Sequence, residues 1–507
     1  MLSTTYKSIF CAVALVGSMA MCSCGDSDPK PGPGNPDKPD PGKPDTPAET
    51  EDVRVITTTS NRSLDLAEST LSFSTTDNMS PSTIRLNPTE EFQTMDGFGV
   101  AITGSTCYNL MKMKPEDRKA FLELTFSPEN GYGFSYCRIS IGCSDFSLDE
   151  YTCCDKEGIE NFALTDEEHN YIIPILKEIL AINPTMKIMG TPWTAPRWMK
   201  VENLENLKPK NSWTSGQLNP KYYQDYAEYF VKWVKAFEKE GIKIYSVTPQ
   251  NEPLNHGNSA SMYMPWQQER DFVKTALGPA FKAAGIDAKI YAFDHNYNYD
   301  NVADQKSYPL NIYKDNEAAQ YLAGAAYHNY GGNKDELTAV HNAAPGMDLV
   351  FSETSIGTWN NGRDLTKRLD DDMREVALGT VNRWCKGVIV WNLMLDEDRG
   401  PYRPGGCSTC YGAVDINRDY TTITRNSHYY IIAHMSSVVK PDAVRIGTSG
   451  FTTSGLDYSA FRNPDGSYAL VANNRNATKV RFVVDDGVRH FTYEMPANSA
   501  ASLTWKD

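Results

Sequence analysis

The chain has 507 residues and a formal net charge of -15 at pH 7. This acidity opposes binding to phosphate backbones, and no run of Lys and Arg provides a local basic patch, so we expect no nucleic-acid partner. The length is sufficient for a large core and favours one large domain with a smaller one beside it.

The first 24 residues have the pattern of an export signal. Lys7 precedes an apolar stretch, residues 9–16, that is too short to span a bilayer. The segment Met-Cys-Ser-Cys-Gly-Asp at residues 21–26 then resembles the lipobox of bacterial lipoproteins. We expect Cys24 to carry the lipid, with Cys22 as the alternative and a plain signal peptide as the competing interpretation. The expected location is therefore the cell envelope or cell surface, with membrane contact through the lipid alone.

Residues 25–52 contain Pro, Gly, Asp and Lys and almost nothing apolar. Such a segment cannot bury enough surface to offset the entropy of ordering, so we predict a disordered tether. Proline-rich chains extend by about 3.1 Å per residue, which would hold a domain on the order of 70 Å from the membrane.

Short apolar runs typical of strands then alternate with longer amphipathic stretches typical of helices. This alternation predicts a parallel sheet covered by helices, and eight strand-helix units predict a (β/α)8 TIM barrel over residues 89–426. The helices include residues 166–182 and 222–239, whose apolar side chains repeat at helical period. The eight expected strands are residues 97–102, 135–141, 187–191, 245–249, 289–293, 324–328, 348–352 and 387–392.

The C-terminal part has a different character. Residues 427–507 hold short alternating runs separated by Asn-Pro-Asp-Gly and Asp-Asp-Gly turns, a pattern that predicts an all-β sandwich. Two further strands are expected before the barrel, at 53–59 and 83–86. We expect residues 53–88 to join the sandwich, because chain termini in barrel enzymes often pair outside the barrel.

Cys407 and Cys410 form a lone Cys-x-x-Cys motif. A zinc site needs a second pair of cysteines or histidines at suitable spacing, and none is nearby. In an exported protein a loop disulfide or two free thiols are the favoured alternatives. We expect no metal and no cofactor.

Two of the expected barrel strands, the fourth and the seventh, lead into a glutamate among small polar residues: Glu252 and Glu353. Functional residues of such barrels lie at the carboxyl ends of the strands. Two carboxylates that face each other across a cleft are the minimum equipment for cleaving a glycosidic bond, one as proton donor and one as nucleophile or base. Glycoside hydrolysis is therefore the leading hypothesis.

The chain resembles glycoside hydrolase family 30, which includes glucosylceramidases and β-1,6-glucanases. The resemblance extends from Gln-Thr-Met-Asp-Gly-Phe-Gly at residues 93–99 to the C-terminal sandwich. Its other landmarks are Asp-Phe-Ser at 145–147, Gly-Thr-Pro-Trp-Thr-Ala-Pro-Arg-Trp-Met-Lys at 190–200, the two glutamate segments, and Val-Trp-Asn-Leu at 390–393. Each is weak alone, but their order and spacing together are specific.

This resemblance implies that Glu252 is the acid/base and Glu353 the nucleophile of a retaining reaction. The acid must keep a proton near neutral pH, and we expect apolar neighbours and a like charge to raise its pKa. By the same resemblance Asn251 would bind the sugar 2-hydroxyl, and Arg138 would hold Glu353 ionised. The residues expected around the non-reducing sugar and the nucleophile are Asp145, Trp193, Trp391, His328 and Tyr330. Trp198 and Trp266 are expected to be packing residues.

Several positions depart from the usual pattern of the family, including Val100, Thr103, Gly104, Asn329 and Val390. They leave the two glutamates untouched but bear on the substrate. We expect a retaining hydrolase of β-glucosidic bonds, with β-1,6-glucan the preferred substrate. Glucosylceramide-like glycosides, xylan and β-1,6-galactan are the alternatives. A glycan-binding lipoprotein without turnover is the alternative from another class.

Overall fold

The computed structural model describes residues 53–74, 80–297 and 302–506. These residues fall within one compact unit, Thr50–Asp507. The expected export signal, the lipidation site Cys24 and the expected tether lie outside the described residues. Within the described part of the chain, no helix combines the length and apolar character needed to cross a bilayer.

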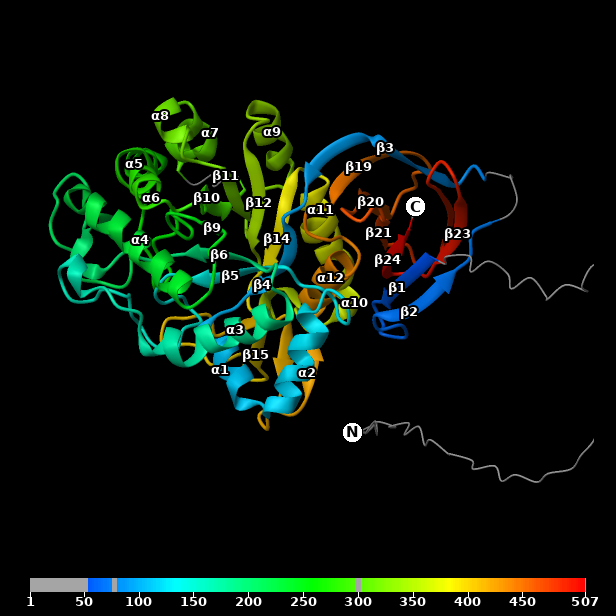
Figure 1. Ribbon diagram of the computed structural model, residues 1–507, viewed down its shortest axis with the longest axis horizontal. Coiled ribbons are helices and arrows are strands. Elements are labelled where there is room, and N and C mark those ends of the chain that lie inside the picture. Colours follow the sequence, from blue (N-terminus) through cyan, green and yellow to red (C-terminus); the bar gives the residue numbers. More distant parts are fainter. Residues whose placement is uncertain (1–52, 75–79, 298–301, 507) are drawn as a thin grey trace, which may run out of the picture. The chain divides into compact units, whose positions relative to one another are not determined.

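Eight parallel strands close into a barrel, which confirms the predicted fold class (Figure 1). They follow one another around the ring in chain order, and each lies at one of the eight positions expected from the sequence. The strands are β4 (Gly97–Ala101), β5 (Tyr136–Ser140), β6 (Lys187–Thr191), β9 (Ser246–Val247), β10 (Lys289–Asn296), β11 (Gly324–His328), β12 (Asp348–Glu353) and β14 (Cys385–Val390).

Helices connect the strands on the outside of the barrel (Figure 1). The expected helix at 222–239 is α4 (Tyr223–Lys239), which buries Phe230, Trp233, Val234 and Phe237. The other α-helices in the described residues are α1 (Gly104–Lys112), α2 (Pro115–Phe126), α3 (Ile173–Ile182), α5 (Trp266–Phe272), α6 (Gly278–Ala284), α7 (Tyr308–Tyr313), α8 (Asn316–Ala319), α9 (Asp335–Ala343), α10 (Leu365–Asp372), α11 (Leu378–Val381) and α12 (Ser427–Ser436).

The barrel interior is a packed core and not a channel. Side chains from six different strands form one buried cluster there: Tyr136, Met189, Tyr291, Ala326, Val350 and Ile389. Gly99 is needed in this wall, because a Cβ at that position would fall 1.8 Å from the carbonyl oxygen of Tyr136. A filled interior leaves the carboxyl ends of the strands as the place for polar chemistry.

Short two- and three-stranded sheets form within the loops of the barrel. They comprise β7 (Lys200–Val201) with β8 (Gln217–Leu218), β13 (Ile356–Gly357) with β16 (Cys410–Tyr411), and β15 (Met394–Asp396) with β17 (Val414–Ile416) and β18 (Ile423–Arg425). The β13–β16 ribbon joins the loop after the seventh barrel strand to the loop after the eighth.

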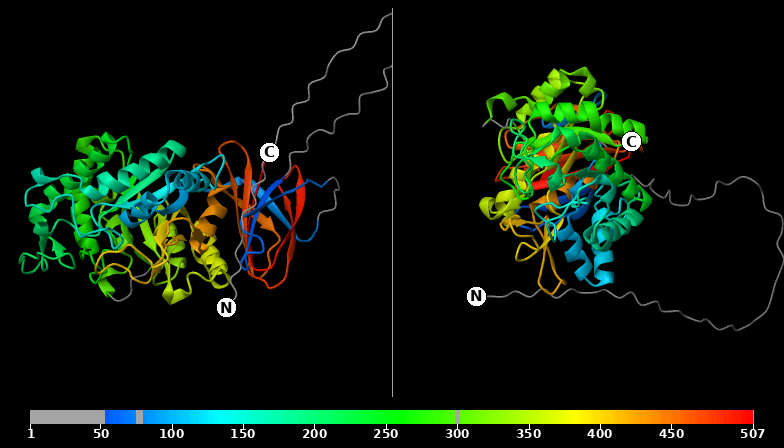
Figure 2. Two further views of the ribbon diagram at one scale, coloured as in Figure 1. Left: turned by 90° about the horizontal axis from the view of Figure 1, so that it is seen from below. Right: turned by 90° about the vertical axis from the view of Figure 1, so that its left-hand side faces the viewer.

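The second large sheet has nine strands and forms the β-sandwich (Figure 2). The first described strand, β1, pairs with the last, β24, so both ends of the described residues contribute to one sheet. In spatial order the strands are β2 (Ala67–Leu71), β1 (Val53–Thr59), β24 (Ser499–Trp505), β21 (Tyr468–Asn474), β20 (Leu456–Arg462), β19 (Val444–Gly450), β3 (Thr83–Thr94), β22 (Val480–Asp485) and β23 (His490–Met495).

Two differences from the sequence-based expectation concern the sandwich and its attachment to the barrel. Strand β3 continues to Thr94, beyond the strand expected at 83–86, because it pairs with β19 along most of its length. The segment after residue 427 begins with helix α12 and not with a strand. All ten residues of α12 are buried, so its sequence lacks the one-sided apolar stripe by which a helix is recognised.

Helix α12 packs between the barrel and the sandwich. His434 on this helix bonds through one ring nitrogen to Ser502 of β24, at 2.8 Å, and through the other to Thr58 of β1, at 2.9 Å. The sandwich is thus attached to the barrel by a buried polar contact as well as by apolar packing.

Candidate active site

A cavity of about 380 Å³ opens at the carboxyl ends of the barrel strands. Both glutamates singled out from the sequence line it, and most of its other walls are polar or aromatic. The lining residues are Asp145, Glu252, Asn255, Asn258, His295, Asn296, Tyr330, Glu353, Ser355, Trp359, Trp391, Cys407 and Cys410.

Glu252 lies on the loop after β9, where the backbone turns through a left-handed conformation with φ of 43°. Its backbone N–H donates to the carbonyl of Asp294, 3.0 Å away, which fixes this turn against β10. The residue is 6% exposed. One carboxylate oxygen accepts hydrogen bonds from the amides of Asn255 and Asn258, at 2.7 and 3.0 Å, and the other lies 3.4 Å from Nδ1 of His328.

Glu353 is the last residue of β12 and is also 6% exposed. The guanidinium of Arg138 donates to one of its carboxylate oxygens at 2.5 Å. The hydroxyl of Tyr330 donates to the other at 2.9 Å. A fixed cation and a phenol therefore hold this carboxylate in place.

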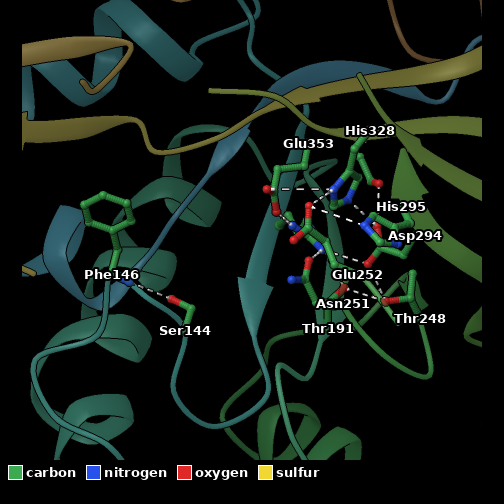
Figure 3. Close-up of polar contacts among 12 residues, drawn as sticks. Ser144, Phe146, Thr191, Thr248, Asn251, Glu252, Asp294, His295, His328 and Glu353 are labelled. Carbon is green, nitrogen blue, oxygen red and sulfur yellow. Dashed lines mark hydrogen bonds and ion pairs between the residues drawn. The ribbon is translucent and has the colours of Figure 1, made fainter. Parts of the chain in front are cut away.

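The two carboxylates converge, and His328 lies between them (Figure 3). An oxygen of Glu252, an oxygen of Glu353 and a ring nitrogen of His328 all lie within 4.8 Å of one another. Retaining glycosidases place their two carboxyl groups about 5–5.5 Å apart, whereas inverting enzymes need about 6.5–9.5 Å for a water molecule. The separation in this site matches the retaining arrangement.

Asp294 joins the two sides of the site (Figure 3). One oxygen accepts from Arg138 at 2.7 Å and from Thr248 at 2.7 Å. The other accepts from Ser352 at 2.5 Å and lies 2.9 Å from Nε2 of His328. Its side chain is fully buried, so the charge is compensated entirely by these neighbours.

The pKa values of the ionisable groups in this network are shifted in different directions. Burial opposes protonation of His328, but Glu353, Asp294 and Glu252 raise its pKa to about 9. Burial alone would raise the pKa of Glu252. The hydrogen bond from His328, the charges of His295 and His328 and the hydrogen bond from the Asn255 amide outweigh burial and lower this pKa to about 2. Burial lowers the pKa of His295 to about 4. These two pKa shifts favour the proton of the Glu252–His328 pair on the histidine.

This result corrects the expectation that the surroundings of Glu252 raise its pKa. The like charge of Glu353 is present, but the nearest partners of Glu252 are basic or donate hydrogen bonds. His295 and His328 come from two other strands, β10 and β11, so their approach to Glu252 depends on closure of the barrel.

The aromatic wall beside the glutamates comes from two strand ends. Trp193 and Trp391 stack with ring centroids 5.1 Å apart, and the guanidinium of Arg138 lies 5.0 Å from the Trp193 ring. Asp145 shares this side of the cavity, where burial and the charge of Glu353 raise its pKa to about 7. Asn251 accepts a hydrogen bond from Arg138 at 2.8 Å, which orients its amide.

The structure brings together the residues that the sequence singled out. Asp145, Glu252, Tyr330, Glu353 and Trp391 line the cavity directly. The others contact these residues, as Arg138, Trp193, Asn251 and His328 do. Trp198 and Trp266 lie apart from the cavity, and each indole N–H donates to a backbone carbonyl.

The polar residues of the site that sequence reasoning missed include Asp294, His295, Asn255 and Asn258. The two asparagines follow Glu252 in an irregular loop that has no periodic pattern. Asp294 and His295 lie at a bulge in β10, immediately beyond the expected strand end at 293. The signal was a carboxylate and a histidine at the end of the fifth barrel strand, the same kind of position that drew attention to Glu252 and Glu353.

Cys407 and Cys410 form a disulfide at the rim of the cavity. This outcome agrees with one of the two favoured alternatives. The remaining cysteines in the described residues are buried thiols: Cys107, Cys137, Cys143, Cys153, Cys154 and Cys385.

Known proteins are similar to this chain in both sequence and fold. The model of the glycosyl hydrolase family 30 TIM-barrel domain matches residues 95–439, and that of the family 30 beta sandwich domain matches residues 442–503. Endo-1,6-beta-D-glucanase neg1 of Aspergillus fumigatus is 32% identical over 75% of this chain and 78% of its own length. Endo-1,6-beta-D-glucanase BGN16.3 of Trichoderma harzianum is 32% identical over 82% of this chain and 84% of its own.

Solved structures give the same result. The endo-beta1,6-glucanase BT3312 is 66% identical, with a TM-score of 0.88 over 90% of this chain and all of that one. SrfJ from Salmonella typhimurium is 26% identical, with a TM-score of 0.80 over the same shares. The barrel and the sandwich thus both have their counterpart in one family of glycosidases. The chain belongs to glycosyl hydrolase family 30.

Proposed function

We propose that this protein is an endo-β-1,6-glucanase that retains the configuration of the sugar it cleaves. The reaction class rests on the convergence of Glu252 and Glu353 within 4.8 Å at the barrel mouth. The linkage rests on similarity to the endo-beta1,6-glucanase BT3312, which is 66% identical to this chain. The two fungal endo-1,6-beta-D-glucanases support the same linkage from a greater distance.

In the first step, an oxygen of Glu353 attacks the anomeric carbon while the glycosidic bond breaks and Glu252 donates a proton to the departing oxygen. The product is a covalent glycosyl-enzyme and a shortened glucan. Arg138 and Tyr330 hold the Glu353 carboxylate aligned before attack. Asn251, held by Arg138, is positioned to bind the sugar 2-hydroxyl, a contact that strengthens in the transition state.

The proton for this step comes from the Glu252–His328 pair. His328 holds it in the empty site, because its two ring nitrogens face the carboxylates of Glu252 and Asp294. When substrate displaces water from the cavity, transfer from Nδ1 to Glu252 gives a neutral acid beside the departing oxygen. The remaining ring N–H then donates to Asp294, so the histidine keeps its orientation through the transfer.

In the second step, water attacks the anomeric carbon and the bond to Glu353 breaks. Glu252 accepts the proton of this water and acts as a base. Two inversions at one carbon return the β configuration. The two carboxylates thus complete the cycle, and the proton taken up by Glu252 can return to His328.

A panel of defined glycans tests the linkage. The wild-type protein and a Glu353→Gln control would be incubated with β-1,6-glucan, xylan, β-1,6-galactan and glucosylceramide. We expect internal cleavage of β-1,6-glucan by the wild type alone, with proton NMR showing the β anomer first. Hydrolysis of xylan but not of β-1,6-linked glucose would reject the linkage. Equal, negligible rates in both proteins would favour a glycan-binding protein without turnover.

We also propose that the protein is exported and attached to the cell envelope by a lipid on Cys24. The lipobox-like segment at residues 21–26 and the proline-rich segment after it support this proposal. Metabolic labelling with a radioactive fatty acid tests it in a bacterial host. We expect Cys24→Ala to lose the label and Cys22→Ala to keep it, and retention of the label by Cys24→Ala would contradict the assignment.

A further inference from the structure

Trp359 is a large apolar side chain that the fold leaves exposed at the edge of the active site. It lies just after β13, lines the cavity that holds Glu252 and Glu353, and is 52% exposed. Large aromatic side chains are mostly buried, because burial of the ring is favourable in free energy. A half-exposed indole in a cavity wall is therefore informative.

The loop that carries Trp359 is held tightly. An ideal Cβ on Gly357 would fall 1.9 Å from a ring carbon of Trp359, so the indole lies directly against this glycine. The backbone N–H of Thr358 donates to the carbonyl of Thr409, at 2.9 Å, inside the segment closed by the Cys407–Cys410 disulfide.

The far side of the loop is anchored as well. The backbone N–H of Gly362 donates to the carbonyl of Gly357 at 2.9 Å, which closes the turn on itself. An ideal Cβ on Gly362 would fall 2.8 Å from the ring of Tyr411 on β16, and the guanidinium of Arg363 lies 4.1 Å from the centre of that ring. The loop therefore holds the indole in a fixed position, and little conformational freedom remains to be lost when a ligand binds.

The sugar that reacts with Glu353 already has an aromatic wall and a hydroxyl acceptor. The stacked pair of Trp193 and Trp391 and the carboxylate of Asp145 provide them. Trp359 is not part of that pair; it belongs to the loop after β12 and follows directly on the β13–β16 ribbon. A flat apolar ring that remains open to solvent is suited to the apolar face of a pyranose ring, which carries C–H groups on one side.

We propose that Trp359 forms a separate subsite that binds a glucosyl unit other than the one that reacts with Glu353. The proposal rests on the proposed function, because only an enzyme acting inside a glucan chain meets neighbouring sugars on its substrate. It assigns Trp359 a role in the affinity for long substrates and none in bond cleavage itself.

Two substrates separate these roles. Gentiotetraose, a β-1,6-linked tetramer of glucose, can fill the neighbouring subsite, whereas 2-deoxy-2-fluoro-β-D-glucosyl fluoride carries one sugar and a leaving group too small to reach it. The variants are Trp359→Ala, Trp359→Phe and Tyr402→Ala. Tyr402 is the matched control, because it is 41% exposed but is not among the residues that line the cavity.

We expect Trp359→Ala to lower kcat/KM for gentiotetraose at least tenfold, mainly through KM, with Trp359→Phe losing less. The rate at which the fluoride inactivates the enzyme should stay within twofold of wild type, and Tyr402→Ala should match wild type in both assays. An unchanged kcat/KM in Trp359→Ala would overturn the proposal. Equal losses with the tetramer and the fluoride would also overturn it, because they indicate damage to the reacting site.

The same experiment separates the two proposals. A wild-type protein that the fluoride inactivates, but that does not cleave β-1,6-linked glucose, would reject the proposed linkage. A wild-type protein that cleaves the tetramer, with Trp359→Ala cleaving it equally well, would reject the subsite alone.

Discussion

Arg138 and Asp294 form an ion pair with no exposure to solvent, at 2.7 Å between a guanidinium nitrogen and a carboxylate oxygen. Each partner has a second connection: Arg138 contacts Glu353, the proposed nucleophile, and Asp294 contacts His328, which lies beside the proposed acid/base Glu252. The pair thus links the two halves of the proposed reaction. Neither residue needs to touch substrate for this role, so Asp294 acts as a positioning residue.

The first prediction concerns Asp294→Asn, which keeps the shape of the side chain but removes its charge. Loss of an anion beside Nε2 of His328 should lower the pKa of that histidine from about 9. The alkaline limb of the pH profile of kcat/KM should therefore move to lower pH. The amide also leaves Arg138 with less compensation, and breaking a buried ion pair costs about 3–5 kcal/mol.

The pH profile and a thermal melt together check this prediction. A purely structural role for Asp294 would lower stability without moving the alkaline limb. An unmoved limb in a folded Asp294→Asn protein would therefore contradict the proposed link to His328.

The second prediction concerns His328→Gln. The change removes the group that holds the proton of the Glu252–His328 pair, so kcat/KM should fall about 100-fold or more, the usual range for general acid–base catalysis. The alkaline limb should then report Glu252 alone, and it should lie well below pH 9. Full activity with an unmoved limb would show that Glu252 obtains its proton elsewhere.

His328 also couples stability to pH. Its folded pKa of about 9 is above the ordinary value of 6.5, so its protonation stabilises the fold fully below pH 6.5. This contribution is lost as the pH rises through 9. Wild type should therefore lose more stability than His328→Gln between pH 6.5 and pH 9, as measured by urea unfolding at each pH.

The third prediction concerns Asp145, whose pKa is raised to about 7 by burial and by Glu353. The folded state resists its ionisation, so above its ordinary pKa of 3.8 this group destabilises the fold, increasingly as the pH rises toward 7. Asp145→Asn should raise the melting temperature at pH 8 by at least about 2 °C, which corresponds to roughly 1 kcal/mol. It should also lower activity, because an acceptor for sugar hydroxyls is lost.

Melting curves at pH 4 and pH 8 are the measurement for Asp145→Asn. The gain in stability should be present at pH 8 and nearly absent at pH 4, where the wild-type carboxyl is already protonated. A variant that is less stable than wild type at pH 8 would be inconsistent with the raised pKa.

The fourth prediction uses the dependence on the leaving group. Glu252→Ala should be severely impaired on β-1,6-glucan, whose leaving oxygen needs a proton, but much less so in the first step on 2,4-dinitrophenyl β-glucoside, whose leaving group does not. Azide should accelerate its turnover and give the β-glucosyl azide, because the anion can enter where the carboxylate was. A Glu252→Ala protein equally impaired on both substrates and unresponsive to azide would argue against the acid/base role.

The barrel was predictable because its signals are local. Each strand is a short apolar run with clear ends, and helices such as α4 carry an amphipathic stripe. Helix α12 could not be found in this way, since its ten residues are buried on every side between barrel and sandwich. The length of β3 depends on partners far along the chain, at β19 and β22.

The same distinction applies to the site. Glu252 and Glu353 stand at strand ends among small polar residues, and a family pattern surrounds them. Asp294 lies beyond an expected strand end, at a bulge with φ of 59° that only the neighbouring strands impose. The sequence-based prediction of a raised pKa for Glu252 was wrong. The direction of this pKa shift depends on His295 and His328, which approach Glu252 only in the closed barrel.

The most direct test of the account is to identify the residue that forms the covalent intermediate. The protein would be inactivated with 2-deoxy-2-fluoro-β-D-glucosyl fluoride, digested and analysed by tandem mass spectrometry. We predict a fluoroglucosyl ester on Glu353 in wild type and in Asp145→Asn, and no label in Glu353→Gln. A label on any other side chain, or turnover by Glu353→Gln at the wild-type rate, would contradict the assignment of Glu353 as the nucleophile.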